Sequence, residues 1–277
     1  MRIGVISDLH VDLNEGSGAE GSVVRSLSAA AANARVELLI VAGDVANRYD
    51  LTLRILADLE AASGLRVLFV PGNHDLWNEA PALPFGKAWD AWDSYRALLA
   101  FPGNLARGLV ELAGGWTVIG DLGWYDYAFG HPRFTVQEFD RMRFAERLWQ
   151  DKVNTLWDRP TLEMHRHFRD TLERQLSAPR EGRLILVTHV VSHAAFTVQP
   201  PSRLWEYLNA FLGSPEYGEL AVRHGAAAAV CGHVHYRRQT VVGGTRFVCS
   251  CLGYSTEWAD PRDIAGEVER SLAVLEI

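Results

Sequence analysis

Aspartate, asparagine and histidine side chains follow five short apolar runs of this sequence, and these residue types can bind metal ions or transfer protons. The segments are Asp8-Leu9-His10, Gly43-Asp44, Gly72-Asn73-His74-Asp75, the lone His189, and Gly232-His233-Val234-His235. Imidazole nitrogens suit zinc, iron and nickel, whereas carboxylate and carbonyl oxygens suit harder ions such as manganese. The residue types therefore indicate a site for divalent metal ions.

The spacing within two of these segments favours convergence on one small volume. Asp8 and His10 are two residues apart, as are His233 and His235, so each pair projects to one side of an extended chain. The candidate ligands are Asp8, His10, Asp44, Asn73, His189, His233 and His235. They are more than one ion needs and suit two ions that share a carboxylate. Two ions roughly 3.5–4 Å apart can clamp both oxygens of a displacement and lower the pKa of a bridging water, which fits phosphate ester hydrolysis.

Each residue also has an ordinary structural explanation when it is taken alone. Asp44 could cap a helix after a strand, Asn73 could be a turn residue, and His189 could be a hydrogen-bonded core histidine. For Asp75 we favour a structural role in its loop. Four further histidines match no pattern and are expected at the surface, namely His131, His165, His167 and His224, and His193 is expected to be structural or at a pocket rim.

The elements that would position these residues alternate between strand and helix. Strands are predicted at 2–7, 36–42 and 65–70, with helices at 22–34 and 51–63 between them. Later strands are predicted at 183–188 and 226–231. Continuous apolar runs of this kind are typical of parallel strands with both faces covered. Because ligands bind at the carboxyl ends of strands in open α/β sheets, the polar segments are where a site is expected.

The middle and end of the chain differ from this alternation. Helices are predicted at 84–101, 134–157 and 161–177, strands at 108–112, 115–120 and 271–275, and a hairpin at 239–250. We expect one α/β domain over residues 1–277, with two packed sheets, outer helices and a helical insertion at about 121–180. Aromatic residues such as Trp124 could line a substrate pocket. An insertion arginine could contact a phosphate, although a solvated helix face is more common.

Composition narrows the function classes. The 277 residues are 48% hydrophobic and 22% charged, which is ordinary for a globular protein, and the net charge of −7 argues against binding long nucleic acid. No apolar run is long enough to cross a bilayer, and Asp8 interrupts the N-terminal run too early for a signal peptide. We therefore expect a cytoplasmic protein with no membrane partner. Nothing in the pattern selects an oligomeric state.

Taken in order from Asp8 to His235, the segments D-x-H, G-D, G-N-H-D, a lone His and G-H-x-H resemble the calcineurin-like metallophosphoesterase superfamily. The resemblance implies a four-layer αββα sandwich of two mixed β-sheets flanked by helices, with a dinuclear centre at the strand ends. It implies a first metal on Asp8, His10 and His235, a second on Asn73, His189 and His233, and Asp44 as the bridge. It also implies that His74 protonates the leaving oxygen or stabilises the transition state while a metal-bridging hydroxide attacks phosphorus.

One departure bears on the substrate. Serine/threonine phosphatases of this superfamily extend the second segment as G-D-x-x-D-R-G, whereas Asn47 replaces the second Asp here and Arg48 matches the phosphate-binding Arg. The neutral Asn47 would raise the basicity of His74 less than an aspartate does. We therefore expect hydrolysis of a small soluble phosphodiester or phosphomonoester, with the diester favoured. A nuclease of the same superfamily and a non-catalytic interaction scaffold are the alternatives. The two divalent ions could be manganese, iron, zinc or nickel.

Overall fold

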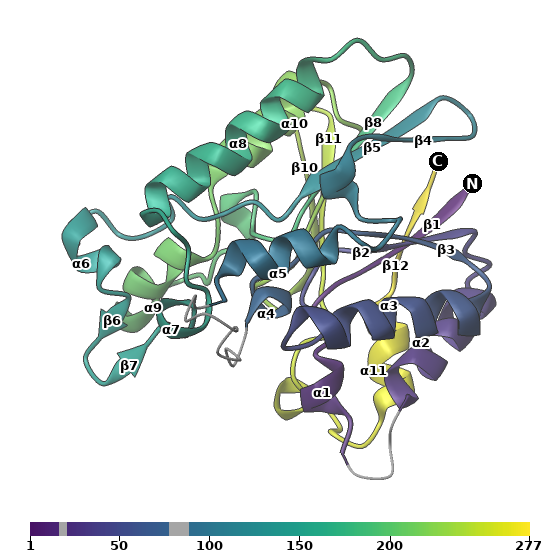
Figure 1. Ribbon diagram of the computed structural model, residues 1–277, viewed down its shortest axis with the longest axis horizontal. Coiled ribbons are helices and arrows are strands. Elements are labelled where there is room, and N and C mark those ends of the chain that lie inside the picture. The colour runs from purple at the N-terminus through teal and green to yellow at the C-terminus, as the bar shows by residue number, and fades with distance from the viewer. Residues whose placement is uncertain (17–20, 78–88) are drawn as a thin grey trace.

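The first β-sheet holds four strands in the order β12-β1-β2-β3 (Figure 1). The strands are β1 (Arg2–Ile6), β2 (Leu38–Val41), β3 (Arg66–Phe69) and β12 (Ala273–Glu276). Strands β1, β2 and β3 are parallel, and β12 is antiparallel to β1, which brings the two ends of the chain side by side. The computed structural model describes residues 1–16, 21–77 and 89–277.

The second sheet has the strand order β10-β11-β9-β8-β5-β4. Its strands are β4 (Val110–Leu112), β5 (Trp116–Asp121), β8 (Arg183–Thr188), β9 (Ala228–Cys231), β10 (Arg237–Val242) and β11 (Thr245–Ser250). The four central strands are parallel, and the edge strands β4 and β10 pair antiparallel to their neighbours. Both sheets are therefore mixed, as expected.

Strands such as β2 are continuous apolar runs because alternate side chains point to opposite faces of the sheet and both faces are buried. On β2, Leu38 and Ile40 pack between the two sheets, whereas Leu39 and Val41 pack against the outer helices. On β8, Ile185 and Val187 face the first sheet, while Leu184 and Leu186 face away from it. Successive residues of a strand point to opposite faces, so a strand buried on both faces must be apolar throughout.

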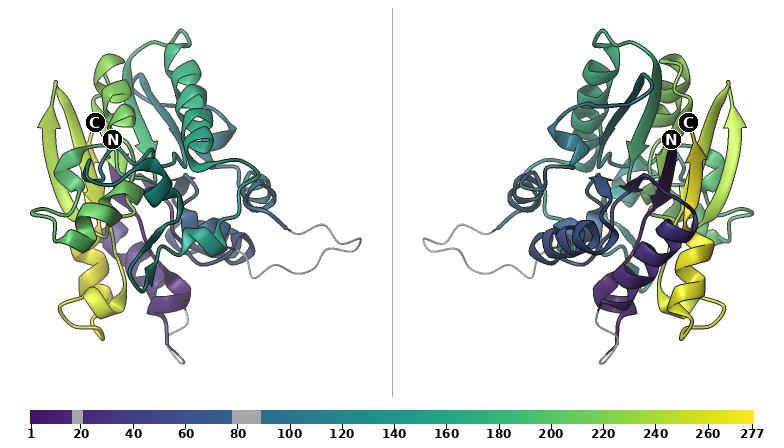
Figure 2. Two further views of the ribbon diagram at one scale, coloured as in Figure 1. Left: turned by 90° about the vertical axis from the view of Figure 1, so that its left-hand side faces the viewer. Right: turned by 90° about the vertical axis from the view of Figure 1, so that its right-hand side faces the viewer.

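Helices cover the outer face of each sheet, as Figures 1 and 2 show. Helices α2 (Ser22–Asn33), α3 (Tyr49–Ser63) and α11 (Ile264–Ser271) pack on the first sheet, and α8 (Thr161–Ser177) and α10 (Pro215–Arg223) pack on the second. The predictions of an α/β class and a four-layer αββα sandwich are confirmed. Among the described residues, no helix is both long and apolar enough to cross a membrane.

The prediction of one helix over 134–157 is wrong. This segment contains α6 (Val136–Asp140), the strand pair β6 (Arg143–Phe144) and β7 (Arg147–Leu148), and α7 (Asp151–Asn154). Met142 and Ala145 have φ values of 51° and 50°, which no right-handed helix accepts. The aromatic residues that suggested helical spacing instead pack on α9 (Arg203–Leu208), where Tyr207 contacts Phe134, Phe139 and Phe144.

The remaining elements are short. Helix α5 spans Ala91–Leu98, and residues 84–88 of the helix predicted at 84–101 lie outside the described residues. Helices α1 (Val11–Asn14) and α4 (Asn73–Leu76) follow β1 and β3; His10 directly precedes α1, and Asn73 and His74 begin α4. Single 3₁₀ turns occur at Leu105–Arg107, Ala194–Phe196, Asn209–Phe211 and Ser255–Glu257.

Candidate metal centre

The structure brings all the candidate ligands to one edge of the sandwich. Asp8 follows β1, Asp44 follows β2, and Asn73 begins α4 just beyond β3. From the second sheet, His189 follows β8 directly and His233 lies two residues beyond β9. Because these strands are parallel within their sheets, their carboxyl ends meet at the same edge.

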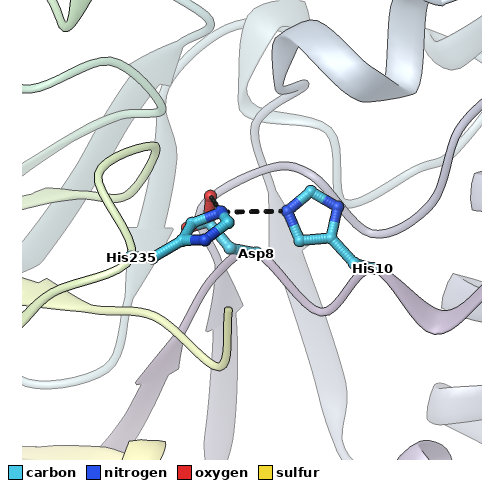
Figure 3. A group of neighbouring side chains, drawn as sticks. All are labelled: Asp8, His10 and His235. Carbon is cyan, nitrogen blue, oxygen red and sulfur yellow. Dashed lines mark hydrogen bonds and ion pairs between the residues drawn. The ribbon is translucent and has the colours of Figure 1, made fainter. Parts of the chain in front are cut away.

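Asp8, His10 and His235 form a first donor group (Figure 3). The two histidine Nε2 atoms face each other at 3.1 Å, and His235 Nε2 lies 3.5 Å from Asp8 Oδ1. Asp8 and His10 are fully buried. Two imidazole nitrogens at this distance need a proton or a cation between them.

Asn73, His189 and His233 form a second donor group. The oxygen Oδ1 of Asn73 lies 3.0 Å from His189 Nε2 and 2.9 Å from His233 Nδ1. The two histidine nitrogens are 3.1 Å apart. One amide oxygen and two imidazole nitrogens thus point at a common volume.

Asp44 lies between the two groups. Its Oδ2 is 3.3 Å from His189 Nε2 and 4.0 Å from His10 Nε2. Its other oxygen accepts a hydrogen bond from the His74 backbone N–H at 2.8 Å. A single carboxylate therefore faces both donor groups.

Hydrogen bonds on the far side of three histidines fix which ring nitrogen faces inward. His189 Nδ1 donates to the Ala42 carbonyl at 2.8 Å, and His233 Nε2 donates to the Phe211 carbonyl at 3.1 Å. His235 Nδ1 donates to Glu257 Oε2 at 2.7 Å. In the neutral form of each ring, the inward nitrogen is therefore the one with the lone pair, which is the arrangement of a metal-binding histidine and its outer partner. The donor set fits divalent cations with mixed nitrogen and oxygen ligands.

The electrostatics of the centre favour a bound cation. Burial and the nearby His235 lower the pKa of His10 to about 3, and burial and His189 lower the pKa of His233 to about 3. Burial also lowers the pKa of His189, but the Asp44 carboxylate more than offsets this and raises it to about 9. Two histidines are thus neutral and ready to bind metal, and a cation beside His189 must displace a proton.

The backbone of the site is strained at most of these positions. Five of the candidate ligands are non-glycine residues in the left-handed region: Asp8 (φ 54°), His10 (41°), Asp44 (54°), His233 (72°) and His235 (54°). Such conformations cost on the order of 1–3 kcal/mol each and cluster at functional sites. The surrounding structure must hold these side chains in place.

Asp75 ties the loops of the site together. Its carboxylate accepts from the backbone N–H groups of Gly72 at 2.7 Å and of Asp44 and Val45 at 2.9 Å, and from Thr52 Oγ1 at 2.6 Å. A Cβ on Gly72 would overlap the Asp44 carboxylate, so only glycine fits there. These contacts agree with the structural role expected for Asp75.

His74 lies at the floor of the cleft beside the donor groups. Its Nδ1 donates to the side-chain oxygen of Asn47 at 2.7 Å, and its Nε2 lies 3.4 Å from the Tyr254 hydroxyl. The Trp77 ring stacks on it with centroids 3.6 Å apart. Burial holds the His74 pKa well below its usual range. Asn47 orients the ring without a negative charge to counter that shift.

The donor groups open into a cleft of about 740 Å³. Asp44, Asn73, His74, His233 and His235 line one side. The opposite side is built by residues that sequence reasoning missed, including Leu148, Trp149, Val198, Trp205, Leu208 and Leu212. Nothing in the sequence separates these apolar residues from core residues, because they lie outside any motif. Of the insertion arginines, Arg147 lines the cleft.

Three other residues differ from the sequence-based expectations. Two do not line the cleft, and one is buried instead of exposed. Arg48 forms a two-point ion pair with Asp50, with contacts of 3.0 and 2.8 Å, and it is not among the residues that line the cleft. Trp124 is buried and stacks on Tyr125 rather than lining the cleft. The prediction that His165 lies at the surface is wrong. It is buried against Glu216 at 3.3 Å, a partner on α10 that sequence spacing cannot reveal.

Comparison with known proteins gives consistent matches. The sequence profile of the calcineurin-like phosphoesterase family matches residues 1–237. The acyl-carrier-protein phosphodiesterase PptH of Mycobacterium tuberculosis is 30% identical over 237 residues, which cover 79% of this chain and 70% of that protein.

Solved structures show the same fold. The crystal structure of phosphopantetheinyl hydrolase PptH from Mycobacterium tuberculosis has a TM-score of 0.73 at 22% identity, over 99% of this chain and 95% of that one. The crystal structure of a Thermus thermophilus protein, TT1561, has a TM-score of 0.52 at 14% identity, over 99% and 98% of the two chains.

Proposed function

This chain belongs to the calcineurin-like phosphoesterase family, and we propose that it is a metal-dependent phosphodiesterase with two divalent cations. The observation that carries the proposal is the position of Asp44, whose Oδ2 faces both donor groups at the floor of the cleft. Phosphate ester hydrolysis is the chemistry that a shared carboxylate between two such groups suits best.

Each donor group would hold one cation. Asp8, His10 and His235 would bind the first, and Asn73, His189 and His233 the second, with Asp44 shared between them. Bound cations would supply positive charge to the phosphoryl oxygens and lower the pKa of a water molecule at the site. The mixture of imidazole and oxygen ligands suits manganese, iron, zinc or nickel.

The chain's own residues would orient the substrate and the leaving group. Asn47 and Trp77 hold the His74 ring, whose Nε2 is the nitrogen left for a leaving oxygen. Tyr254 places a hydroxyl beside that nitrogen. Arg147 offers a guanidinium to a phosphate oxygen from the opposite wall. Arg48 stays a weaker candidate for this contact, because Asp50 already pairs with it.

The size and lining of the cleft favour a diester over a monoester. A phosphate group alone fills a small part of 740 Å³, and apolar side chains such as Trp149, Trp205 and Leu208 line the space beyond the donor groups. An organic group on either side of the phosphorus would pack there. Since the relative PptH is named for an acyl-carrier-protein substrate, we extend the expected small substrate to a protein-linked phosphodiester.

The test compares three substrates on the metal-loaded protein. Bis-p-nitrophenyl phosphate, p-nitrophenyl phosphate and a phosphopantetheinyl acyl carrier protein are assayed with manganese, and bound metals are counted by elemental analysis. We expect about two ions per chain and preference for diesters, with release of the carrier protein's prosthetic group. Preference for the monoester would contradict the diesterase. A chain that holds no metal and turns over no substrate would instead support the scaffold alternative. Single-stranded DNA is assayed in parallel, and its cleavage would support the nuclease.

A further inference from the structure

Asp151 reaches the candidate metal centre from a part of the chain that supplies no candidate ligand. It is the first residue of α7 and one of the residues that line the cleft, and only 2% of its surface is exposed. Its carboxylate lies against Asn73, 78 residues earlier in the sequence. The sequence gives no hint of this contact.

The carboxylate is buried among uncharged donors. Its hydrogen bonds come from Asn73 Nδ2 (2.8 Å), Trp77 Nε1 (2.9 Å) and Thr155 Oγ1 (3.2 Å) to Oδ1, and from Trp149 Nε1 (2.8 Å) and Tyr125 OH (3.4 Å) to Oδ2. None of these partners carries a charge. A buried carboxylate is costly unless it is well hydrogen-bonded, so a set of this size shows that the surroundings are built around it.

The bond to Asn73 decides which end of its amide faces the second donor group. Since Nδ2 donates to Asp151, Oδ1 is directed at His189 and His233. An amide NH₂ has no lone pair to offer a cation, so a flipped Asn73 would lose the ligand. A neutral acceptor such as a hydroxyl would fix the amide less firmly than a carboxylate does.

The same carboxylate fixes two rings that touch the centre. Trp77, held by Oδ1, stacks on His74. Trp149, held by Oδ2, lies edge-on to His233 with ring centroids 5.8 Å apart. Asp151 thus contacts, directly or through one ring, a candidate ligand of the second group and the residue that would meet the leaving group.

We propose that Asp151 is a positioning residue for the second metal site, holding the Asn73 amide with its oxygen toward the cation. This inference rests on the proposed function, because it takes Asn73, His189 and His233 as ligands. Outer partners of metal ligands are typically worth about 10–100-fold in metal affinity. Among the described residues, Asp8, His10 and His235 form no hydrogen bond or ion pair with Asp151, so the first site is expected to keep its affinity.

The test measures metal affinity rather than activity alone. Asp151→Asn keeps the size of the side chain but removes an acceptor, and manganese binding is followed by equilibrium dialysis with elemental analysis. We expect one of the two binding steps to lose about 10–100-fold in affinity, with the other step unchanged. The kcat for bis-p-nitrophenyl phosphate falls while its KM changes little. Asp140→Asn is the matched control, since Asp140 lies in the same segment and accepts from Tyr127 OH without touching Asn73.

A reciprocal exchange separates positioning from general support of the fold. Adding Asn73→Asp to Asp151→Asn places the acceptor at position 73 and the donor at position 151, which restores their hydrogen bond and keeps an oxygen ligand. We expect this double variant to recover at least about tenfold of the second-site affinity lost in Asp151→Asn. If the single variant does not fold, the double variant is expected to fold and bind two ions.

The outcomes distinguish the two proposals. Asp151→Asn that shows the wild-type near-ultraviolet circular dichroism and binds two ions with wild-type affinity overturns the positioning role. A folded double variant whose second-site metal affinity is no higher than that of the single variant overturns it as well. If the single variant is unfolded, a folded double variant that binds only one ion also overturns it. Wild-type protein that binds fewer than two ions contradicts the proposed function instead.

Discussion

The two walls of the cleft are built in different ways. The donor wall comes from residues directly after strands β1, β2, β3, β8 and β9, and the parallel strands of each sheet fix where those residues lie. The opposite wall comes from residues 147–151 and 198–212, where short elements are joined by aromatic contacts and by the hydrogen bonds of Asp151. Under the proposed function, the donor wall would carry the chemistry and the opposite wall would contact the organic part of the substrate.

The largest effect is expected from the centre of the donor wall. Asp44→Ala removes the oxygen that faces both donor groups, so both ions bind weakly and kcat/KM for bis-p-nitrophenyl phosphate falls by at least roughly 10³-fold. Steady-state kinetics and bound-metal analysis check this, with the exposed Asp58→Ala on α3 as control. Full metal content and near-normal turnover in Asp44→Ala would mean that the donor wall is not the reaction site.

His74 tests whether the same wall also serves the leaving group. His74→Ala keeps every candidate ligand, so we expect two bound ions together with a kcat lowered about 10²–10⁴-fold for a diester with a poor leaving group. The loss should shrink for p-nitrophenyl leaving groups, which need less help. An equal loss for good and poor leaving groups would argue that His74 supports the site only through packing.

Asp121 lies outside both walls of the cleft, at the end of β5 and ahead of the insertion. Burial raises the pKa of its carboxyl to about 6, although the hydrogen bond from Tyr95 opposes the shift. Because the folded pKa lies above the unfolded one, the stabilisation is present at low pH and is lost as pH rises from about 4 through 6. Between pH 4 and pH 7, wild type should lose about 2 kcal/mol of unfolding free energy relative to Asp121→Asn.

Urea denaturation of both proteins across this pH range measures that difference. If the difference in unfolding free energy between wild type and Asp121→Asn stays constant with pH, the Asp121 carboxyl does not titrate in this pH range. Activity of the folded protein should not follow this change, since Asp121 touches no residue of the donor wall in the described structure.

The smallest effect is expected from the opposite wall. Arg147→Gln removes an exposed guanidinium from the cleft, and its KM for the carrier-protein diester should rise about tenfold, the value of one charge-assisted hydrogen bond. The KM for bis-p-nitrophenyl phosphate should change much less. Arg143→Gln on the neighbouring β6 is the control. Equal increases in KM for both substrates would indicate that Arg147 does not select the carrier-protein diester and that the donor wall does.

The contrast between the walls also explains what could be predicted from the sequence. The strands were predictable because Leu38–Val41 and the central residues 184–187 of β8 are buried on both faces and apolar at every position. The ligand types and their order follow directly from the residues after those strands. The candidate ligands could be recognised without knowledge of long-range contacts, since each segment follows a predictable strand.

The opposite wall offered no comparable pattern. Phe139 and Phe144 fall in a segment predicted as one helix, yet they pack on Tyr207 from another part of the chain, and the positive φ of Met142 leaves no sequence signal. Asp151 meets Asn73 only in the folded chain. Contacts between segments far apart in the sequence determine the structure of this wall, and local sequence patterns do not reveal such contacts.

The left-handed residues of the donor wall have a consequence for the protein's evolution. Glycine at Asp8, His10, Asp44, His233 or His235 would relieve backbone strain, but it would also remove a candidate ligand. Selection for thermal stability alone would therefore be expected to erode these positions early, as mutations that stabilise at the expense of activity commonly do. Their retention in a lineage would record continued selection for catalysis, which makes these five backbone positions a marker for telling active relatives from inactive ones.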